Sequence, residues 1–444
     1  MSSPHASELQ DHVFRNFNAI VATSGLSWDR RRCWGPMQAT ATVFVMRSPG
    51  SGYTTRTAIP KVRELFGPMF GWQDDPDSSG LSRARRRVTE PEMVALWMRV
   101  QQWSQAQAAP VGVLLPGMTV AAIDGTTLHL PRSRSTVKSF PIARDALELE
   151  THHYPQARLV SAWDVERRVP LAWRLTSQRI GERASLQDLL PELPERSVVL
   201  LDRGFPSRSV LGDIVGAGRD VVVRMVAAQA GSWPEVTAFL ASGQESAIVP
   251  VTIQQGRRKR AVPMRLVLRS FARGRPHTGE HRDRMVILTT LTDAQGVSDE
   301  QVIALYHQRW GIETIHREMK GIAAVERWHG TTKLLIRQEI HAVMCWFAIA
   351  GAIASRVEAD ATADQHQAGD ERPEKRANTN LVFNAVHKVL AWQAAIGHQH
   401  EAVVDYLRSH AETALDMVRR FMQRRRPGRW HERKPKHPYA RDIA

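Results

Sequence analysis

Three acidic residues stand at positions where carboxylates commonly do chemistry. Asp124 and Asp202 each follow a short apolar run with the pattern of a β-strand, and Glu313 lies in a segment with helical periodicity. Active sites of α/β sheets cluster at strand ends, where loops admit ligand. A lone strand-end Asp is more often a turn residue, so only the three carboxylates together indicate a site. Converging carboxylates would offer two Mg²⁺ ions the oxygen ligands that these ions use in phosphoryl transfer.

The segment around Glu313 places charge where a helix should bury apolar side chains. At about 100° per residue, four side chains fall within an arc of roughly 60° on one helix face. They are Tyr306, Arg309, Glu313 and Lys320, here called the polar stripe, and apolar residues such as Val302 and Ile312 surround them. Unpaired buried charge is costly. We therefore expect Glu313 to bind metal, so that Arg309 and Lys320 need not neutralise it and would bind DNA phosphates. Tyr306 would offer DNA a hydroxyl or a stacking ring.

The spacing of the polar stripe is Tyr, two residues, Arg, three residues, Glu, six residues, Lys. This pattern resembles the signature of the DDE transposases of bacterial insertion sequences, specifically the insertion-sequence-four type. Ile-Asp-Gly-Thr around Asp124 is similar to the first Asp motif of that family, and Leu-Asp-Arg-Gly-Phe around Asp202 is similar to its second. The resemblance covers about residues 80–350, with weaker similarity in the basic tail.

The resemblance implies a ribonuclease-H-like catalytic core that is interrupted by a β-rich insertion. It also implies that Asp124, Asp202 and Glu313 are the catalytic residues and hold two Mg²⁺ or Mn²⁺ ions. The expected activity is cut-and-paste transposition, in which strands are cleaved at the element ends and then joined to target DNA. The implied partners are double-stranded DNA, as terminal inverted repeats and target, and a second copy of the chain in a homodimeric synaptic complex.

Other residues with a possible role are less distinctive. Some relatives hold a flipped base with an aromatic residue of the insertion, for which Trp233 is the candidate, although a buried structural Trp fits its position equally well. His152-His153 could ligate a metal, but no motif completes the site and a loop is favoured. Asp164 could support the metal site or be an ordinary strand-end Asp. Arg224 could reach a phosphate or form a structural ion pair.

The charge of the chain favours a polyanionic partner. Its formal net charge is +15 and its pI is about 10.5, which suits nucleic acid but does not by itself exclude anionic lipid. The charge is concentrated at one end, because residues 418–444 hold ten Lys or Arg against two acidic residues, a balance of 10 − 2 = +8. We expect residues 424–444 to form a disordered basic tail that adds to the salt dependence of DNA binding.

Cysteine content and hydropathy indicate a protein of a reducing compartment. Two cysteines, Cys33 and Cys345, make neither a disulfide framework nor a zinc site. The longest apolar stretch, residues 342–354, is shorter than the roughly 20 residues that span a bilayer, and it is expected to be a buried helix. No basic segment followed by an apolar run precedes it at the N-terminus. A cytoplasmic protein with no membrane segment, bound to the nucleoid through DNA, is the expectation.

The elements that must position the carboxylates alternate between strands and helices. Five strands are expected before residue 226, with a helix at 185–193 among them, and three more between 247 and 291. Strands followed by a helix and further strands predict an α/β fold with a mixed sheet. Ser298 and Gln301 form a capping box that starts the helix bearing the polar stripe, and Thr89 with Glu92 starts another.

Changes in composition divide the chain into seven parts. These are an N-terminal helical, DNA-contacting region (1–112), the first part of the catalytic core (113–228), the β-rich insertion (229–293), the rest of the core (294–356), a flexible linker (357–378), C-terminal helices (379–423) and the basic tail (424–444).

Two other functions remain open at this point. A domesticated or inactive relative of the transposases would bind DNA without recombining it, and the sequence alone does not separate it from an active enzyme. A glycoside hydrolase could use paired carboxylates. That function would leave the basic tail and the two cations of the polar stripe unexplained.

Overall fold

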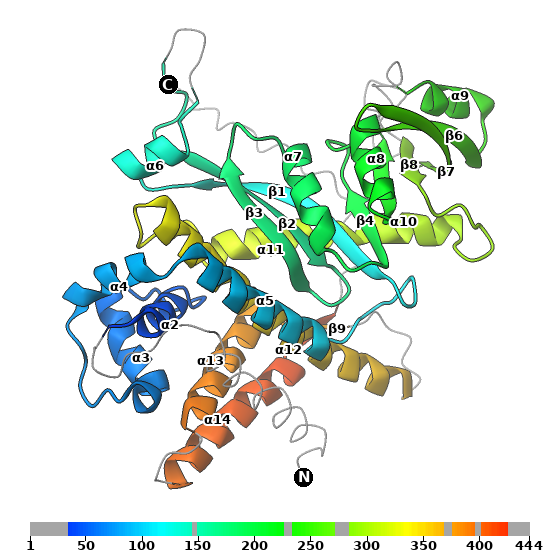
Figure 1. Cartoon of the computed structure of the whole chain (residues 1–444). Helices are drawn as coiled ribbons and strands as arrows, with labels where there is room; N and C mark the ends of the chain where they lie inside the picture. Colours follow the sequence, from blue (N-terminus) through cyan, green and yellow to red (C-terminus); the bar gives the residue numbers. More distant parts are fainter. Residues whose placement is uncertain are drawn as a thin grey trace, which may run out of the picture.

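The computed structural model describes residues 34–143, 149–225, 233–270, 284–367, 375–395 and 401–424. Its centre is one eight-stranded sheet with helices on both faces, which confirms the predicted α/β class (Figure 1). The strands are β1 (Thr119–His129), β2 (Gln156–Asp164), β3 (Val169–Ser177), β4 (Ser197–Leu201), β5 (Asp220–Met225), β6 (Ser246–Gln255), β7 (Arg258–Ser270) and β8 (Arg284–Thr289).

The sheet is mixed in the way that the strand pattern predicts. Its order is β3-β2-β1-β4-β5-β8-β7-β6. Strands β1, β4 and β5 are parallel, and the pairs β1–β2, β2–β3, β5–β8, β7–β8 and β6–β7 are antiparallel. The parallel strands are near-continuous runs of Val, Leu, Ile and Ala, as expected for strands that are covered on both faces.

The two faces of the sheet have separate cores. Successive residues of a strand point to opposite faces, so Ala121 and Ile123 join the core beneath helices α7 (Glu182–Leu189) and α8 (Arg208–Gly216). Val120 and Ala122 join the core on the other face. There the sheet is covered by α5 (Glu90–Gln107), α10 (Asp299–Gln308), α11 (Trp310–Gly321) and α12 (Lys333–Gln367) (Figure 1).

The β-rich insertion continues the main sheet. We expected a β-subdomain between residues 229 and 293, and the described part of this region has helix α9 (Pro234–Ser242) and strands β6 to β8. Strand β8 pairs directly with β5. An uncovered edge of β5 would leave unpaired backbone groups, and β8 satisfies them, so the insertion does not form a separate sheet.

The helix of the polar stripe is divided in two. The capping box of Ser298 and Gln301 is present, but the expected single helix ends at Gln308, and α11 begins at Trp310. At the junction the Arg309 amide donates to the Tyr306 carbonyl (3.1 Å), three residues back instead of four. Trp310, the first residue of α11, is 57% exposed.

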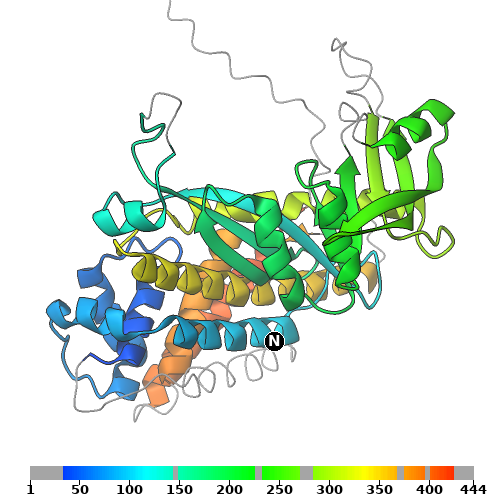
Figure 2. The same cartoon turned by 45° about the horizontal axis from the view of Figure 1, so that its top comes forward.

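Helix α12 lies alongside α5 under the sheet (Figure 2). By length and composition it could cross a membrane, but 94% of its most apolar window is buried inside the protein, as expected for a core helix. It also corrects the predicted linker, because residues 357–367 are helical. Glu358, at the start of that stretch, is 1% exposed and accepts hydrogen bonds from Arg168 Nη1 (2.6 Å) and the Ala377 amide (2.8 Å).

Helices α2 (Pro36–Met46), α4 (Leu81–Arg87) and α13 (Thr379–Ala395) also pack against α12 (Figures 1 and 2). Glu339 of α12 is fully buried, and its carboxylate lies 2.9 Å from Arg85 Nη2 and 3.9 Å from Arg47 Nη1. The remaining helices are α3 (Thr55–Phe70), α6 (Arg134–Ser139) and α14 (Glu401–Arg420), with short 3-10 turns η1 (Ser78–Gly80) and η2 (Leu190–Glu192) and a ribbon of β9 (Lys375–Arg376) and β10 (Gln423–Arg424). The predicted basic tail beyond Arg424 and residues 1–33, with Cys33, lie outside the described residues.

Candidate active site

Two of the predicted carboxylates lie on neighbouring central strands. Asp202 follows the end of β4 as expected, but Asp124 lies inside β1, which continues to His129. Strands β1 and β4 are parallel neighbours with Ala122 opposite Leu200, and each of these residues stands two positions before an aspartate. Asp124 and Asp202 therefore project from adjacent positions on neighbouring strands, as predicted. Each carboxylate also accepts a hydrogen bond from a nearby backbone amide: Asp124 Oδ1 from Gly125 within the strand (2.9 Å), and Asp202 Oδ1 from Gly204 in the turn after β4 (2.8 Å).

The third carboxylate, Glu313, lies on α11, the helix that packs against β1. Arg309 joins it to the sheet, because Arg309 Nη2 lies 2.6 Å from Glu313 Oε1 and Arg309 Nη1 lies 4.0 Å from Asp124 Oδ2. This arrangement corrects one expectation: the guanidinium does neutralise Glu313. The Arg309 side chain is only 7% exposed, and a cation in that position needs anionic neighbours.

Burial raises the pKa of Asp124 above the ordinary value of an aspartate. Its side chain is 19% exposed, and the loss of hydration raises its pKa to about 6. The Gly125 amide and Arg309 oppose this increase, whereas the negative charges of Glu182 and Asp202 add to it. The carboxylates therefore influence one another, and Asp124 takes up a proton close to neutral pH.

Glu182 is a fourth acidic group at the site, and the sequence did not identify it. It lies in the first turn of α7, and its carboxylate covers Gly125: a Cβ on Gly125 would stand 2.5 Å from Glu182 Oε1. Burial raises the pKa of Glu182, with Arg158 opposing and Asp202 adding to the increase. A glycine inside a strand often indicates such a close approach, and Gly125 was the available signal.

His316 fixes α11 against the sheet. It lies one turn after Glu313, and its Nε2 is 3.0 Å from Ser161 Oγ, on the residue opposite Asp124 in the β1–β2 register. Trp163 Nε1 donates to the same Ser161 oxygen (2.9 Å), so the serine hydroxyl is free to donate to the imidazole. Burial, with a contribution from Lys320, lowers the pKa of His316 to about 4. The imidazole is therefore neutral in neutral solution.

The four residues expected to contact DNA differ in exposure. Lys320 is exposed, and Arg309 is at the site but paired. Tyr306 is 3% exposed and its ring centre lies 5.8 Å from the Arg309 guanidinium, so the ring supports Arg309 and has no open face. Trp233 is 5% exposed, with the Arg208 guanidinium 4.7 Å from its ring centre. The structure thus favours the structural alternative for Trp233, because a base could not reach its ring.

The other candidate residues, Asp164, His152 and His153, lie in a turn and in an exposed segment. Asp164 caps the β2–β3 turn, where its Oδ1 accepts from the amides of Glu166 (3.1 Å) and Arg167 (2.9 Å). His152 and His153 are exposed in the segment before β2. Within the described ranges, no group of three His, Cys, Asp or Glu side chains is close enough together to hold a metal ion.

The donor chemistry of the site nevertheless suits a hard cation. Asp124, Asp202 and Glu313 offer only carboxylate oxygens, the ligand type that Mg²⁺ and Mn²⁺ take. The positive charge of Arg309 stands between two of them, at 2.6 Å and 4.0 Å. A divalent ion bound by these carboxylates would replace that charge.

Comparisons with known proteins identify the family of this chain. Residues 115–348 match the family described as Transposase DDE domain, a range that contains all three carboxylates and the polar stripe. A transposase of Escherichia coli (strain K12), InsG for insertion sequence element IS4, is 22% identical over 271 residues. The alignment covers 60% of this chain and 58% of that relative, so the chain spans less than two thirds of it. By its family match, which covers more than half of its length, this chain belongs to the family of transposases with a DDE domain.

Proposed function

We propose that this chain is an active transposase that carries out metal-dependent cut-and-paste DNA transposition. It would act as a DNA nuclease and polynucleotidyl transferase, first cleaving strands at the element ends and then joining them to target DNA. The observation that carries the proposal is the placement of Asp124 and Asp202 on neighbouring parallel strands, with Glu313 linked to them through Arg309.

The strand order supports a ribonuclease-H-like core. Strands β3, β2 and β1 are antiparallel in succession, and β4 and β5 follow in parallel to β1. Helices α7 and α8 make the crossovers between parallel strands. In this proposal β6 to β8 are the insertion between the second Asp and the Glu.

Asp124, Asp202 and Glu313 would hold two Mg²⁺ or Mn²⁺ ions. When bound, such ions activate the attacking oxygen and stabilise the leaving oxygen of an in-line phosphoryl displacement. Arg309 balances the charge of Glu313, and from the same position its guanidinium can bind a DNA phosphate. Lys320, exposed on α11, would contact phosphate further along the backbone.

The charge of the chain supports DNA as the substrate. A net charge of +15 attracts duplex DNA without sequence preference. We propose terminal inverted repeats and target DNA as the double-stranded partners and a homodimer as the synaptic form. We also propose that the protein works in the cytoplasm, bound to the nucleoid.

The test is strand cleavage by Glu313→Gln. We expect the variant to lose Mg²⁺-dependent cleavage at the element ends by several orders of magnitude and to keep end binding, because the amide is a weaker metal ligand of the same size. Glu318→Gln on the same helix is the matched control and should cleave normally. Normal cleavage by Glu313→Gln would contradict the catalytic assignment.

A domesticated relative that only binds DNA is the second candidate. The family match does not distinguish it from an active enzyme, and the same assay does, since such a protein would bind ends without cutting them. Short inverted repeats and a target-site duplication around the gene would identify a mobile element. A glycoside hydrolase is not supported, because the matched family is one of transposases.

A further inference from the structure

The helix pair α10–α11, which carries the polar stripe, is held at both ends by parts of the chain outside the central strands. It runs beneath the sheet from the insertion toward the helices of the N-terminal region (Figure 1). Arg265 of the insertion reaches the first turn of α10, and Arg47 of the N-terminal region reaches the end of α11. Neither arginine has a role in the proposed chemistry.

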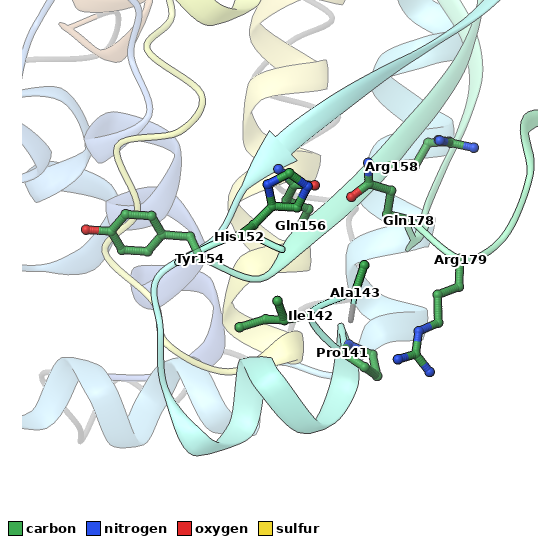
Figure 3. A pocket seen from close by; sticks show the side chains of 9 residues that line it. All are labelled: Pro141, Ile142, Ala143, His152, Tyr154, Gln156, Arg158, Gln178 and Arg179. Carbon is green, nitrogen blue, oxygen red and sulfur yellow. The ribbon is translucent and has the colours of Figure 1, made fainter. Parts of the chain in front are cut away.

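Both arginines are buried, which is rare for this residue type. Arg265 is 1% exposed and Arg47 is 3% exposed. Arg179, for comparison, is exposed where it lines a cavity of about 280 Å³ beside β2 (Figure 3). Replacing a buried ion pair by apolar residues of similar volume is often neutral or stabilising, so stability alone gives no reason for these arginines. A guanidinium differs from an apolar side chain in its rigid fork of donors, which fixes distance and direction.

Arg265 fixes the start of α10. From β7, its Nε donates to Asp299 Oδ1 (2.9 Å), its Nη2 pairs with the same carboxylate, and its Nη1 donates to the Val297 carbonyl (2.7 Å). Ser246 Oγ of β6 also donates to Asp299 Oδ1 (3.0 Å). Val297 and Asp299 flank Ser298, the N-cap of α10. Two strands of the insertion therefore hold both sides of the helix start, and α10 cannot shift or rotate without breaking these contacts.

Arg47, the C-cap of α2, fixes the end of α11. Its Nη1 donates to the Arg327 carbonyl (2.5 Å), and its Nη2 donates to the carbonyls of Ala324 (3.1 Å) and Ala323 (3.3 Å). These carbonyls lie just after α11, where Ala324 has a left-handed backbone with φ of 44°. Residues other than glycine adopt this conformation at a cost, and Arg47 holds the turn in place. Glu339 balances the charge of Arg47 from 3.9 Å.

Glu313 lies between these two fixed ends. Helix α10 carries Tyr306, whose ring supports Arg309, and Arg309 pairs with Glu313 at 2.6 Å and lies 4.0 Å from Asp124. The helix is interrupted at Arg309, so α10 and α11 do not form one rigid rod. Because of this break, a contact that holds one of the two helices does not by itself hold the other. Each helix needs an attachment of its own, and each has one buried arginine at its outer end.

We propose that Arg265 and Arg47 are positioning residues of the candidate active site, which hold α10 and α11 so that Glu313 stays beside Asp124 and Asp202 and can share a divalent ion with them. The insertion and the N-terminal region are then required for metal binding, in addition to any contact that they make with DNA. The inference rests on the proposed function, since it takes the three carboxylates as metal ligands.

The test is Mn²⁺ binding by the full chain without DNA, measured by electron paramagnetic resonance, which distinguishes free from bound Mn²⁺. Arg265→Met should lower the Mn²⁺ affinity about tenfold, as when groups that orient metal ligands are removed. The variant should still fold, because the side chain of Asp299 is one third exposed and water can solvate it. Arg265→Lys keeps a positive charge near Asp299 and should recover part of the affinity.

Arg208→Met is the matched control. The Arg208 guanidinium also pairs with a carboxylate, that of Glu235 (3.0 Å), and also donates to a backbone carbonyl, that of Thr252 (2.6 Å). It joins α8 to α9 and β6, however, and not to α10. Arg208→Met should lower the thermal stability as Arg265→Met does and leave the Mn²⁺ affinity unchanged. A folded Arg265→Met with the same Mn²⁺ affinity as the unmodified chain would show a merely structural arginine and overturn the inference.

Two further variants test the same contacts without depending on Arg265→Met. Asp299→Asn keeps the size of the side chain at a partly exposed position and should lower the Mn²⁺ affinity in the same direction but less. Arg47→Met tests the other end and should again lower it about tenfold, since Glu339 keeps Arg85 as a partner at 2.9 Å. Unchanged Mn²⁺ affinity in both variants would overturn only this inference. An unmodified chain that binds no Mn²⁺ would overturn the proposed metal site and this inference with it.

Discussion

At the residue scale, the site is defined by carboxylates that share a small volume with one cation. Burial raises the pKa of Asp124, and Arg309, which is also paired with Glu313, opposes that increase. Glu182 has the opposite effect on Asp124. The balance of these charges sets how readily the site accepts a divalent ion, so substitutions here should be visible in pH profiles.

The raised pKa of Asp124 has a consequence for stability. Its folded pKa of about 6 lies above the ordinary value of 3.8, so ionisation destabilises the folded state, fully above pH 6 and less as the pH falls toward 3.8. Asp124→Asn should therefore increase the free energy of unfolding by up to about 3 kcal/mol at pH 7.5 in metal-free buffer.

The gain from Asp124→Asn should shrink as the pH falls through 6, which urea unfolding at several pH values can measure. The exposed Asp188, changed to Asn, is the control. A gain that does not depend on pH would mean that the carboxylate is not the cause.

Glu182 should act on the reaction through Asp124. Removing its charge with Glu182→Gln should lower the pKa of Asp124, since the neighbouring negative charge raises it. We expect the lower-pH limb of the cleavage profile to move to lower pH. The rate at the optimum should fall on the order of tenfold, as for groups that orient metal ligands.

The exposed Glu195, changed to Gln, serves as the control for Glu182→Gln. A merely structural Glu182 would alter the rate or the stability without moving the pH limb, and that outcome would argue against this role.

At the scale of elements, the site depends on how α11 and α12 are held against the sheet. The break at Arg309 separates α10 from α11 and leaves Arg309 facing the carboxylates. His316 and Ser161 then lock α11 to β2. Helix α12 crosses the β2–β3 turn so closely that a Cβ on Gly351 would collide with the Arg168 carbonyl oxygen.

Gly351→Ala should therefore destabilise the fold by about 1–3 kcal/mol, as in overpacked cores. Gly321→Ala at the end of α11 is the matched control, because nothing lies within 4 Å of a Cβ there, and it should be neutral or slightly stabilising. Thermal unfolding of both variants measures the difference. Equal stability of the two variants would show that α12 can move away from the turn.

At the scale of the whole molecule, one continuous sheet connects the insertion to the central strands, and the positive charge favours DNA binding. The insertion extends the central sheet, because β8 pairs with β5 and joins β6 and β7 to the central strands. The basic tail is known only from its sequence. Residues 425–444 contain seven Lys or Arg, and each phosphate that they neutralise contributes about 0.9 to the salt dependence on duplex DNA.

Deleting residues 425–444 should weaken duplex binding most at low salt and reduce the slope of log K against log salt by several times 0.9. Binding titrations at a series of salt concentrations would measure this slope. An unchanged slope after the deletion would contradict DNA binding by the tail.

The sequence alone was enough to identify the family of this protein. The spacing of the polar stripe and the motifs around Asp124 and Asp202 indicated the family and the three acidic residues that we propose as catalytic, since strand and helix periodicity are local properties. The capping boxes of Thr89 and Ser298 likewise followed from local pattern. Tertiary structure alone decided which groups face one another. Glu182 covers Gly125, Arg309 neutralises Glu313, and Tyr306 and Trp233 are buried, because burial and ion pairing depend on neighbours that are far away in the chain.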